Sequence, residues 1–411
     1  MTRRGRAVLA LGVFCWIVAV VFGSPALYPV AAGLVLVVPL AAAWVRITLR
    51  QPHVSRRWRQ EDAVWRKEDL LERDDVWIQI ELEREPGIPP PSVVARERVG
   101  QLAEREVELR PHSRGRHWGS YHLHNVPRGR HGFEPVRLTI TDPFALAEAR
   151  LTLDEQQALV VYPRLVALEQ VFFDGGAGPE HGRRLLLRRP VGFDLHSVRD
   201  YQQGESLRRV HWPSTARRGS LMVKELEDSP RDEVAVLLDG DPAGVTGSPP
   251  DSSFDFAVRA AGSILRAQVR SGRRCVLLLN TAGREMQAVT SEGPEWQQAL
   301  ELLAAAEPDA RSPAADLLRS ADTPAARSLE LVVVTSRIVG TLVDRLLERA
   351  LTRRAVALVH VEPESFVGGP RRPVPELLRL QAAGVPIAVV RYGDDLATAL
   401  HGAAAPEAAR A

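Results

Sequence analysis

The sequence predicts a multidomain protein with two N-terminal transmembrane helices, a small all-β sandwich and a C-terminal, doubly wound α/β domain. Three observations predict this fold class. Residues 7–45 contain no charged side chain, residues 74–164 hold short alternating stretches separated by Pro or Gly, and from residue 231 continuous apolar runs alternate with amphipathic stretches. The length of 411 residues is sufficient for two or three domains, each with its own core.

The uncharged run of 39 residues is long enough for two membrane spans, because one span needs about 20 residues. Gly23-Ser24-Pro25 lies near its middle and is a natural turn. We therefore expect a helical hairpin within residues 1–50, with helices at about 7–22 and 27–44. A cleaved signal peptide is the alternative, and the second apolar stretch directly after the first argues against it.

The arginines indicate the orientation of this hairpin. The first 60 residues hold eight Arg and no acidic residue, with Arg on both flanks of the apolar run and none in the connecting turn. The positive-inside rule then predicts a two-pass protein of the inner (cytoplasmic) membrane with both termini in the cytoplasm. Only two cysteines occur, which fits a reducing compartment, and no Cys/His spacing is typical of a zinc site.

Two regions follow the hairpin. Residues 51–73 are polar and contain Trp58 and Trp65, which indicates a juxtamembrane helix or linker. Residues 74–164 form short alternating stretches with Pro or Gly between many of them, which is typical of a small β-sandwich. The predicted strands are 76–80, 92–95, 105–109, 137–140 and 159–162.

Residues 165–230 show neither the hydrophobic periodicity of a helix nor that of a strand, and they are locally basic. From His181 to Arg231 there are eleven Arg or Lys against six Asp or Glu. Guanidinium groups there fit an anion-binding or partner-binding surface, or an ion-paired clasp in which Arg199, Arg208 and Arg217 meet Asp200, Glu205 and Glu225. Beside a bilayer, lipid phosphate or a protein is a simpler partner than nucleic acid. The candidate residues are Ser197, Arg199, Tyr201, Arg208, His211, Trp212, Ser214, Arg217 and Lys224.

Residues 231–400 read as an α/β domain, because continuous apolar runs between amphipathic helices are typical of a parallel sheet with both faces covered. The predicted strands are 233–238, 275–279, 331–334, 355–361 and 385–390, and the predicted helices are 254–269, 295–306 and 339–350. Residues 401–411 are expected to be a disordered tail.

Ligands of open parallel sheets bind beyond the carboxyl ends of the strands, where Asp239 and Asp241 follow the first predicted strand. Two carboxylates there are able to hold Mg²⁺. The simpler interpretation is that the two aspartates stabilise a turn or cap a helix. No phosphate-binding loop, nucleophile elbow or His-Glu-x-x-His motif is present in the sequence. A catalytic constellation is therefore not evident.

The central segment resembles the signature of the domain-of-unknown-function 58 family. The resemblance rests on Phe193, Ser197-Val198-Arg199-Asp200-Tyr201, Gly204-Glu205, Arg208-Arg209-Val210-His211-Trp212, Ser214, Ala216-Arg217 and Leu221-Met222-Val223-Lys224-Glu225. Upstream, Arg128-Gly129-Arg130-His131-Gly132, Thr141-Asp142-Pro143-Phe144 and Val161-Tyr162-Pro163-Arg164 are similar to that family's β-domain pattern. The resemblance implies a bacterial membrane protein with a von Willebrand factor A-like C-terminal domain, encoded beside MoxR-type AAA+ ATPases and transglutaminase-like membrane proteins.

Such A-domains carry a metal site that begins D-x-S-x-S. The matching positions here are Asp239, Asp241 and Ala243, so that one Ser is Asp and the other is absent. A further metal-binding Asp is expected where this chain has Thr335-Ser336-Arg337, and Arg337 would repel a cation. We therefore expect a degenerate site, little or no Mg²⁺ affinity and no other cofactor.

These features predict a non-enzymatic, membrane-anchored scaffold or adaptor. Its A-like domain would bind protein, with a MoxR-type AAA+ ATPase and other membrane proteins of the same gene cluster as the implied partners. The alternative is an enzyme or ligand sensor that binds an acidic or phosphorylated molecule at Arg199, His211 and Arg217. A metal-dependent adhesion domain is a third hypothesis.

Overall fold

The computed structural model describes residues 1–48, 52–60, 69–84, 92–113, 115–168, 195–200, 211–226, 233–319, 323–352, 354–370 and 373–401. For residues 195–200, 213, 223–226 and 233 only the backbone is described. The chain divides into two compact units, residues 1–162 and 163–411, and each is described by itself. The predicted tail beyond residue 401 lies outside the described residues.

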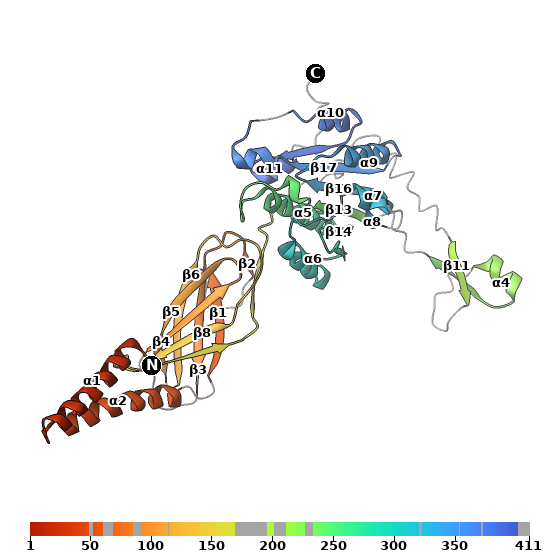
Figure 1. The fold of residues 1–411 in the computed structure, drawn as a ribbon. Coiled ribbons are helices and arrows are strands. Elements are labelled where there is room, and N and C mark those ends of the chain that lie inside the picture. Colours follow the sequence, from red (N-terminus) through yellow and green to blue (C-terminus); the bar gives the residue numbers. More distant parts are fainter. Residues whose placement is uncertain are drawn as a thin grey trace. The chain divides into compact units, whose positions relative to one another are not determined.

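The N-terminal unit begins with two apolar helices, α1 (Arg3–Val21) and α2 (Leu27–Thr48), which form a hairpin (Figure 1). Both are long and apolar enough to cross a membrane. They pack closely at Gly12, where an added Cβ would lie 2.9 Å from the Val35 side chain. The helices agree with the predicted pair, and α1 begins earlier because Thr2 caps it by accepting a hydrogen bond from the Gly5 amide at 3.0 Å.

Two β-sheets follow in the same unit. The larger has the order β1-β3-β6-β5-β4-β8-β9 and the smaller the order β2-β10-β7. In the larger sheet burial alternates along strands such as β3, because successive side chains point to opposite faces. Residues of both sheets share one hydrophobic core, which includes Ile78 and Ile80 of the larger sheet and Leu159 and Val161 of the smaller. The strands are β1 (His53–Gln60), β2 (Leu70–Leu71), β3 (Val76–Glu83), β4 (Ser92–Val99), β5 (Ala103–Ser113), β6 (Arg116–Leu123), β7 (Gly129–Gly132), β8 (Val136–Thr141), β9 (Glu148–Leu153) and β10 (Ala158–Tyr162).

Strand β1 corrects the predicted linker at residues 51–73. It pairs antiparallel with β3 along its whole length and forms one edge of the larger sheet. Its sequence looks like a solvated segment because it carries three arginines, but Arg56 is 5% exposed and ion-paired with Glu97. Only the partner strand reveals that this arginine points inward.

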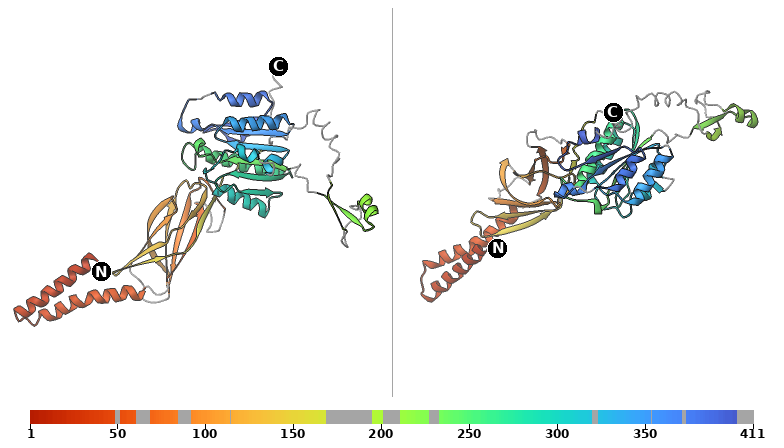
Figure 2. Two further views of the ribbon diagram at one scale, coloured as in Figure 1. Left: turned by 45° about the vertical axis from the view of Figure 1, so that its right-hand side comes forward. Right: turned by 90° about the horizontal axis from the view of Figure 1, so that it is seen from above.

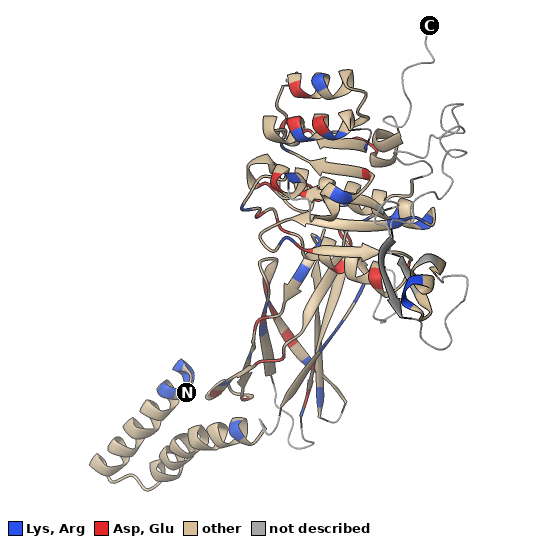
Figure 3. Ribbon diagram, turned by 90° about the vertical axis from the view of Figure 1, so that its right-hand side faces the viewer, with Lys and Arg blue, Asp and Glu red and all other residues tan. Residues whose placement is uncertain are grey.

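The β domain contacts the basic end of the helical hairpin. The Thr2 amide donates to the Leu146 carbonyl at 3.1 Å, and Gly5 leaves room for the same carbonyl. Arg3, Arg4 and Arg6 lie at the start of α1 and Arg46 lies near the end of α2, so the arginines of both helices gather at one end of the hairpin (Figure 3). The β domain therefore adjoins the end of the hairpin that carries the positive charge.

The C-terminal unit contains a six-stranded sheet of order β15-β14-β13-β16-β17-β18, parallel except for the edge strand β15. Its strands are β13 (Glu233–Asp239), β14 (Arg274–Asn280), β15 (Met286–Val289), β16 (Glu330–Thr335), β17 (Ala355–Val361) and β18 (Ile387–Val390). The helical elements are η3 (Pro242–Gly244), α5 (Ser253–Arg270), α6 (Pro294–Ala305), α7 (Ala315–Arg319), α8 (Pro324–Arg327), α9 (Gly340–Leu351), η4 (Pro363–Val367), α10 (Pro375–Ala382) and α11 (Leu396–His401).

Helices cover both faces of this sheet (Figure 2). Alternate residues of β13 belong to two cores: Val234 and Val236 pack with α5, α6 and α11, whereas Ala235 and Leu237 pack with α7, α8, α9 and α10. Burial on both faces explains the continuous apolar runs of the strands. The predicted doubly wound α/β arrangement is confirmed. The short strand β15 was not predicted, because its sequence Met-Gln-Ala-Val is not a continuous apolar run.

The basic segment contributes a small hairpin. Strands β11 (Leu195–Asp200) and β12 (Met222–Leu226) pair antiparallel, and the short helix α4 (Trp212–Arg218) precedes β12. His211 caps α4, and Gly219 ends it in the left-handed conformation at φ 72°.

Candidate functional site

A polar row crosses the carboxyl edge of the α/β sheet. Asp239 lies opposite Asn280 of β14, and on its other side the paired residues Thr335 and His360 continue the row into β16 and β17. Because the four strands are parallel, their polar ends meet at one edge. All four residues are buried, so their hydrogen bonds decide what the edge is able to do chemically.

Asp239 is held by its two neighbours. Its Oδ1 accepts from Asn280 Nδ2 at 2.8 Å and its Oδ2 accepts from the Thr335 hydroxyl at 2.8 Å. Burial raises the pKa of this carboxyl, and the two hydrogen bonds oppose that rise. Both carboxylate oxygens of Asp239 are thus hydrogen-bonded to neighbouring strands of the sheet.

Asp241 is paired with a cation of the protein. Arg337 NH1 donates to its Oδ2 at 2.8 Å, and its Oδ1 accepts from the Ala243 amide at 2.9 Å. The residues at this edge therefore do not fit a divalent metal: a guanidinium already neutralises one carboxylate, and the other has a donor on each oxygen. Arg337 was expected to repel a cation, and it instead binds the carboxylate that would hold one.

Ser336 and His360 are two further buried polar residues at this edge. Neither Ser336 Oγ nor His360 Nδ1 has a hydrogen-bond partner among the described residues. They are therefore not hydrogen-bonded to each other, as a nucleophile and its general base would be. Burial lowers the pKa of His360, which favours the neutral ring.

A hollow of about 180 Å³ lies beside this edge, between the end of β14 and the end of α6. Its lining includes three carboxylates, Glu285, Glu307 and Asp309, and no Lys or Arg. Such a lining favours a basic side chain as occupant. The edge thus offers a hollow lined by three carboxylates next to an ion-paired rim.

The structure places the predicted residues of the basic segment only in part. Tyr201 and Arg208 lie outside the described residues, and for Ser197, Arg199 and Lys224 only the backbone is described. His211 Nδ1 lies 2.8 Å from the Ser214 hydroxyl, so these two form a helix cap. Trp212 is 65% exposed, and Arg217 is exposed in the last turn of α4.

Asn280 is the residue of the edge that the sequence did not reveal, and Thr335 was singled out only as a position where a metal-binding Asp is expected. Each is the last residue of its strand. The one signal is position: a polar residue that ends a buried apolar strand lies at the edge where ligands of such sheets bind.

Residues 197–365 match the family described as "Protein of unknown function DUF58". An uncharacterised protein of Bacillus subtilis (strain 168), YeaD, is 28% identical over 227 residues. That similarity covers 53% of this chain and 53% of the relative, so the chain spans about half the length of the curated relative that it matches.

Proposed function

From the premise that this chain belongs to the DUF58 family, we propose that it is a membrane-anchored scaffold whose α/β domain binds a protein partner. One observation carries the proposal. At the carboxyl edge, where ligands of parallel sheets bind, the two carboxylates are occupied by groups of the protein itself, and an acidic hollow lies beside them.

The anchor is the helical hairpin. Its arginines gather at the end that adjoins the β domain, and Phe144, which is 69% exposed, lies two residues from the carbonyl that accepts from Thr2. If the basic end faces the cytoplasm, the β domain lies against the inner face of the inner membrane with both termini in the cytoplasm. Phe144 would then lie at the depth of the lipid headgroups.

The anchor predicts how the protein fractionates. Full-length protein should stay with the membrane pellet after alkaline carbonate extraction, because two apolar spans hold it. A tag at the C-terminus should be digested by protease in inside-out vesicles and protected in spheroplasts. Release by carbonate, or digestion of the tag in spheroplasts, would contradict the anchor or its orientation.

The partner that we propose is a MoxR-type AAA+ ATPase, which the family resemblance implies. The α/β domain would serve as a von Willebrand factor A-like module, and a Lys or Arg of the ATPase would enter the hollow lined by Glu285, Glu307 and Asp309. This arrangement needs neither catalysis nor a metal from this chain.

Capture from native membranes tests the partnership. Full-length protein with a C-terminal affinity tag, solubilised in mild detergent, should retain the AAA+ ATPase at low salt and lose much of it at high salt, because charge pairs at a rim are screened. Recovery of no ATPase at low salt would remove the main support for a scaffold.

The second candidate is a sensor or enzyme that binds an anion at the basic segment. Arg217 and Arg218 are exposed in the last turn of α4, and among the described residues neither has an ion-pair partner. If the capture experiment yields no protein partner and inorganic phosphate instead protects α4 from proteolysis, this reading replaces the scaffold.

A further inference from the structure

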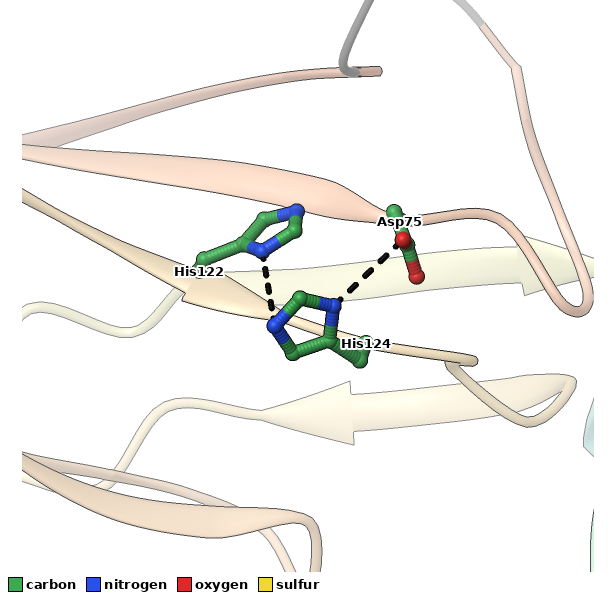
Figure 4. Close-up of side chains that lie close together, drawn as sticks. All are labelled: Asp75, His122 and His124. Carbon is green, nitrogen blue, oxygen red and sulfur yellow. Dashed lines mark hydrogen bonds and ion pairs between the residues drawn. The ribbon is translucent and has the colours of Figure 1, made fainter.

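Two histidines and an aspartate meet on the outer face of the β domain, far in sequence from the basic segment and the α/β sheet (Figure 4). His122 lies near the end of β6 and His124 directly follows that strand, two residues on, so the two share one face. Asp75 directly precedes β3, which pairs with β6 so that Trp77 lies opposite His122. The strand pairing therefore brings Asp75 beside His124.

The ring nitrogens of the two histidines point at one another. His122 Nδ1 lies 3.0 Å from His124 Nε2, and His124 Nδ1 lies 3.4 Å from Asp75 Oδ2. The ligand atoms of the three residues all lie within 4.8 Å of one another. Two imidazole ligands of a tetrahedral Zn²⁺ are about 3.3 Å apart, given Zn–N bonds of about 2.0–2.1 Å. The observed distance between His122 Nδ1 and His124 Nε2 therefore needs to increase by only a few tenths of an ångström to admit the ion.

Neighbouring groups hold all three side chains. The Trp77 ring stacks on His122 with centroids 4.7 Å apart and planes 23° apart. The Asn125 amide donates to Asp75 Oδ1 at 2.8 Å, and this hydrogen bond lowers the pKa of Asp75, which favours the carboxylate. A carboxylate that accepts from one ring nitrogen of a histidine leaves the lone pair on the other nitrogen, as in carboxylate–histidine–zinc sites.

We propose that Asp75, His122 and His124 form a binding site for a divalent transition metal of the Zn²⁺, Cu²⁺ or Ni²⁺ class. His122 Nδ1 and His124 Nε2 are the ligands, and Asp75 orients His124. The cation takes the place of the hydrogen between the two ring nitrogens, and His122 then carries its proton on Nε2. Imidazole ligands select this class over Mg²⁺ and Ca²⁺, which prefer oxygen. His124 is exposed, so the remaining coordination positions are open to water or to a partner's ligand.

Zn²⁺ titration of untagged, full-length protein in detergent, followed by calorimetry, tests the site. We expect one Zn²⁺ bound per chain at neutral pH and no heat with Mg²⁺. His122→Gln or His124→Gln should weaken binding at least tenfold, and Asp75→Asn should weaken it about 10–100-fold, as loss of a carboxylate that orients a ligand does. His112→Gln, an exposed histidine on β5, is the matched control and should bind as the wild type does.

Absence of saturable Zn²⁺ binding in the wild type would overturn the proposal, and so would wild-type affinity in both histidine variants. Loss of affinity in the His112→Gln control would assign the binding elsewhere and would equally overturn it.

Discussion

Glu97→Ala should lower the free energy of unfolding of the β domain by about 3–5 kcal/mol, because it leaves a buried arginine without its acid. The Glu97 and Arg56 side chains are both 0% exposed and ion-paired. The Tyr121 hydroxyl also donates to Glu97 at 2.7 Å, so that the substitution leaves two buried donors without an acceptor. Urea titration of full-length protein in detergent, followed by tryptophan fluorescence, measures the loss.

The neighbouring pair Arg96–Glu106 provides the control. It joins the adjacent strands β4 and β5 at 2.7 Å, but both side chains are more than half exposed, at 53% and 56%. Glu106→Ala should therefore cost only about 0–1 kcal/mol. The double variant Arg56→Met/Glu97→Leu, which removes both buried charges, should be more stable than Glu97→Ala alone. Equal losses for Glu97→Ala and Glu106→Ala would show that Glu97 is not a buried partner.

Asp239→Ala should destabilise the α/β domain by about 2–3 kcal/mol, because it removes the acceptor that Asn280 and Thr335 share. Asp239→Asn should cost less than about 1 kcal/mol. Its amide oxygen still accepts from Asn280, and its amide nitrogen donates to the Thr335 hydroxyl, which is able to turn its own proton to the Arg337 carbonyl at 2.9 Å. Thermal unfolding of the full-length variants compares the two.

A comparison of the wild type with Asp239→Asn also tests the raised pKa of Asp239. Burial favours the protonated carboxyl, so the stabilisation from this group is complete below its unfolded pKa of about 3.8 and is lost as the pH rises through the higher folded value. The stability of the wild type relative to Asp239→Asn should therefore fall as the pH rises from about 4. A constant difference across this range would show that Asp239 has an ordinary pKa.

The α/β domain was predictable because its signal is local. The apolar runs 233–238 and 331–334 became the buried strands β13 and β16, and the uncharged N-terminal run became two helices. Strand β1 was missed because its pattern depends on Arg56, whose partner Glu97 is 41 residues away. From the sequence alone, a buried arginine cannot be distinguished from a solvated one until the strand that carries its acidic partner is known.

The sequence pointed to Asp239, Asp241 and the segment Thr335-Ser336-Arg337 but not to the hydrogen bonds that join them. Asn280 and Thr335 reach Asp239 through the register of three parallel strands, which no motif encodes. The histidine pair shows the same limit. His122 and His124 are adjacent on one face by local spacing, whereas Asp75 joins them only through the pairing of β3 with β6.

Site-specific photo-crosslinking in intact cells tests most directly whether the carboxyl edge binds a partner. Ala243, exposed in η3 after β13, and Gln381, exposed near the end of α10 and before β18 at the opposite edge, would each be replaced by p-benzoylphenylalanine in the full-length protein. We predict that position 243 forms a crosslink to the AAA+ ATPase in the membrane fraction and that position 381 forms none. Crosslinks of equal yield at both positions, or none at 243 in cells that contain the ATPase, would contradict a binding surface at this edge.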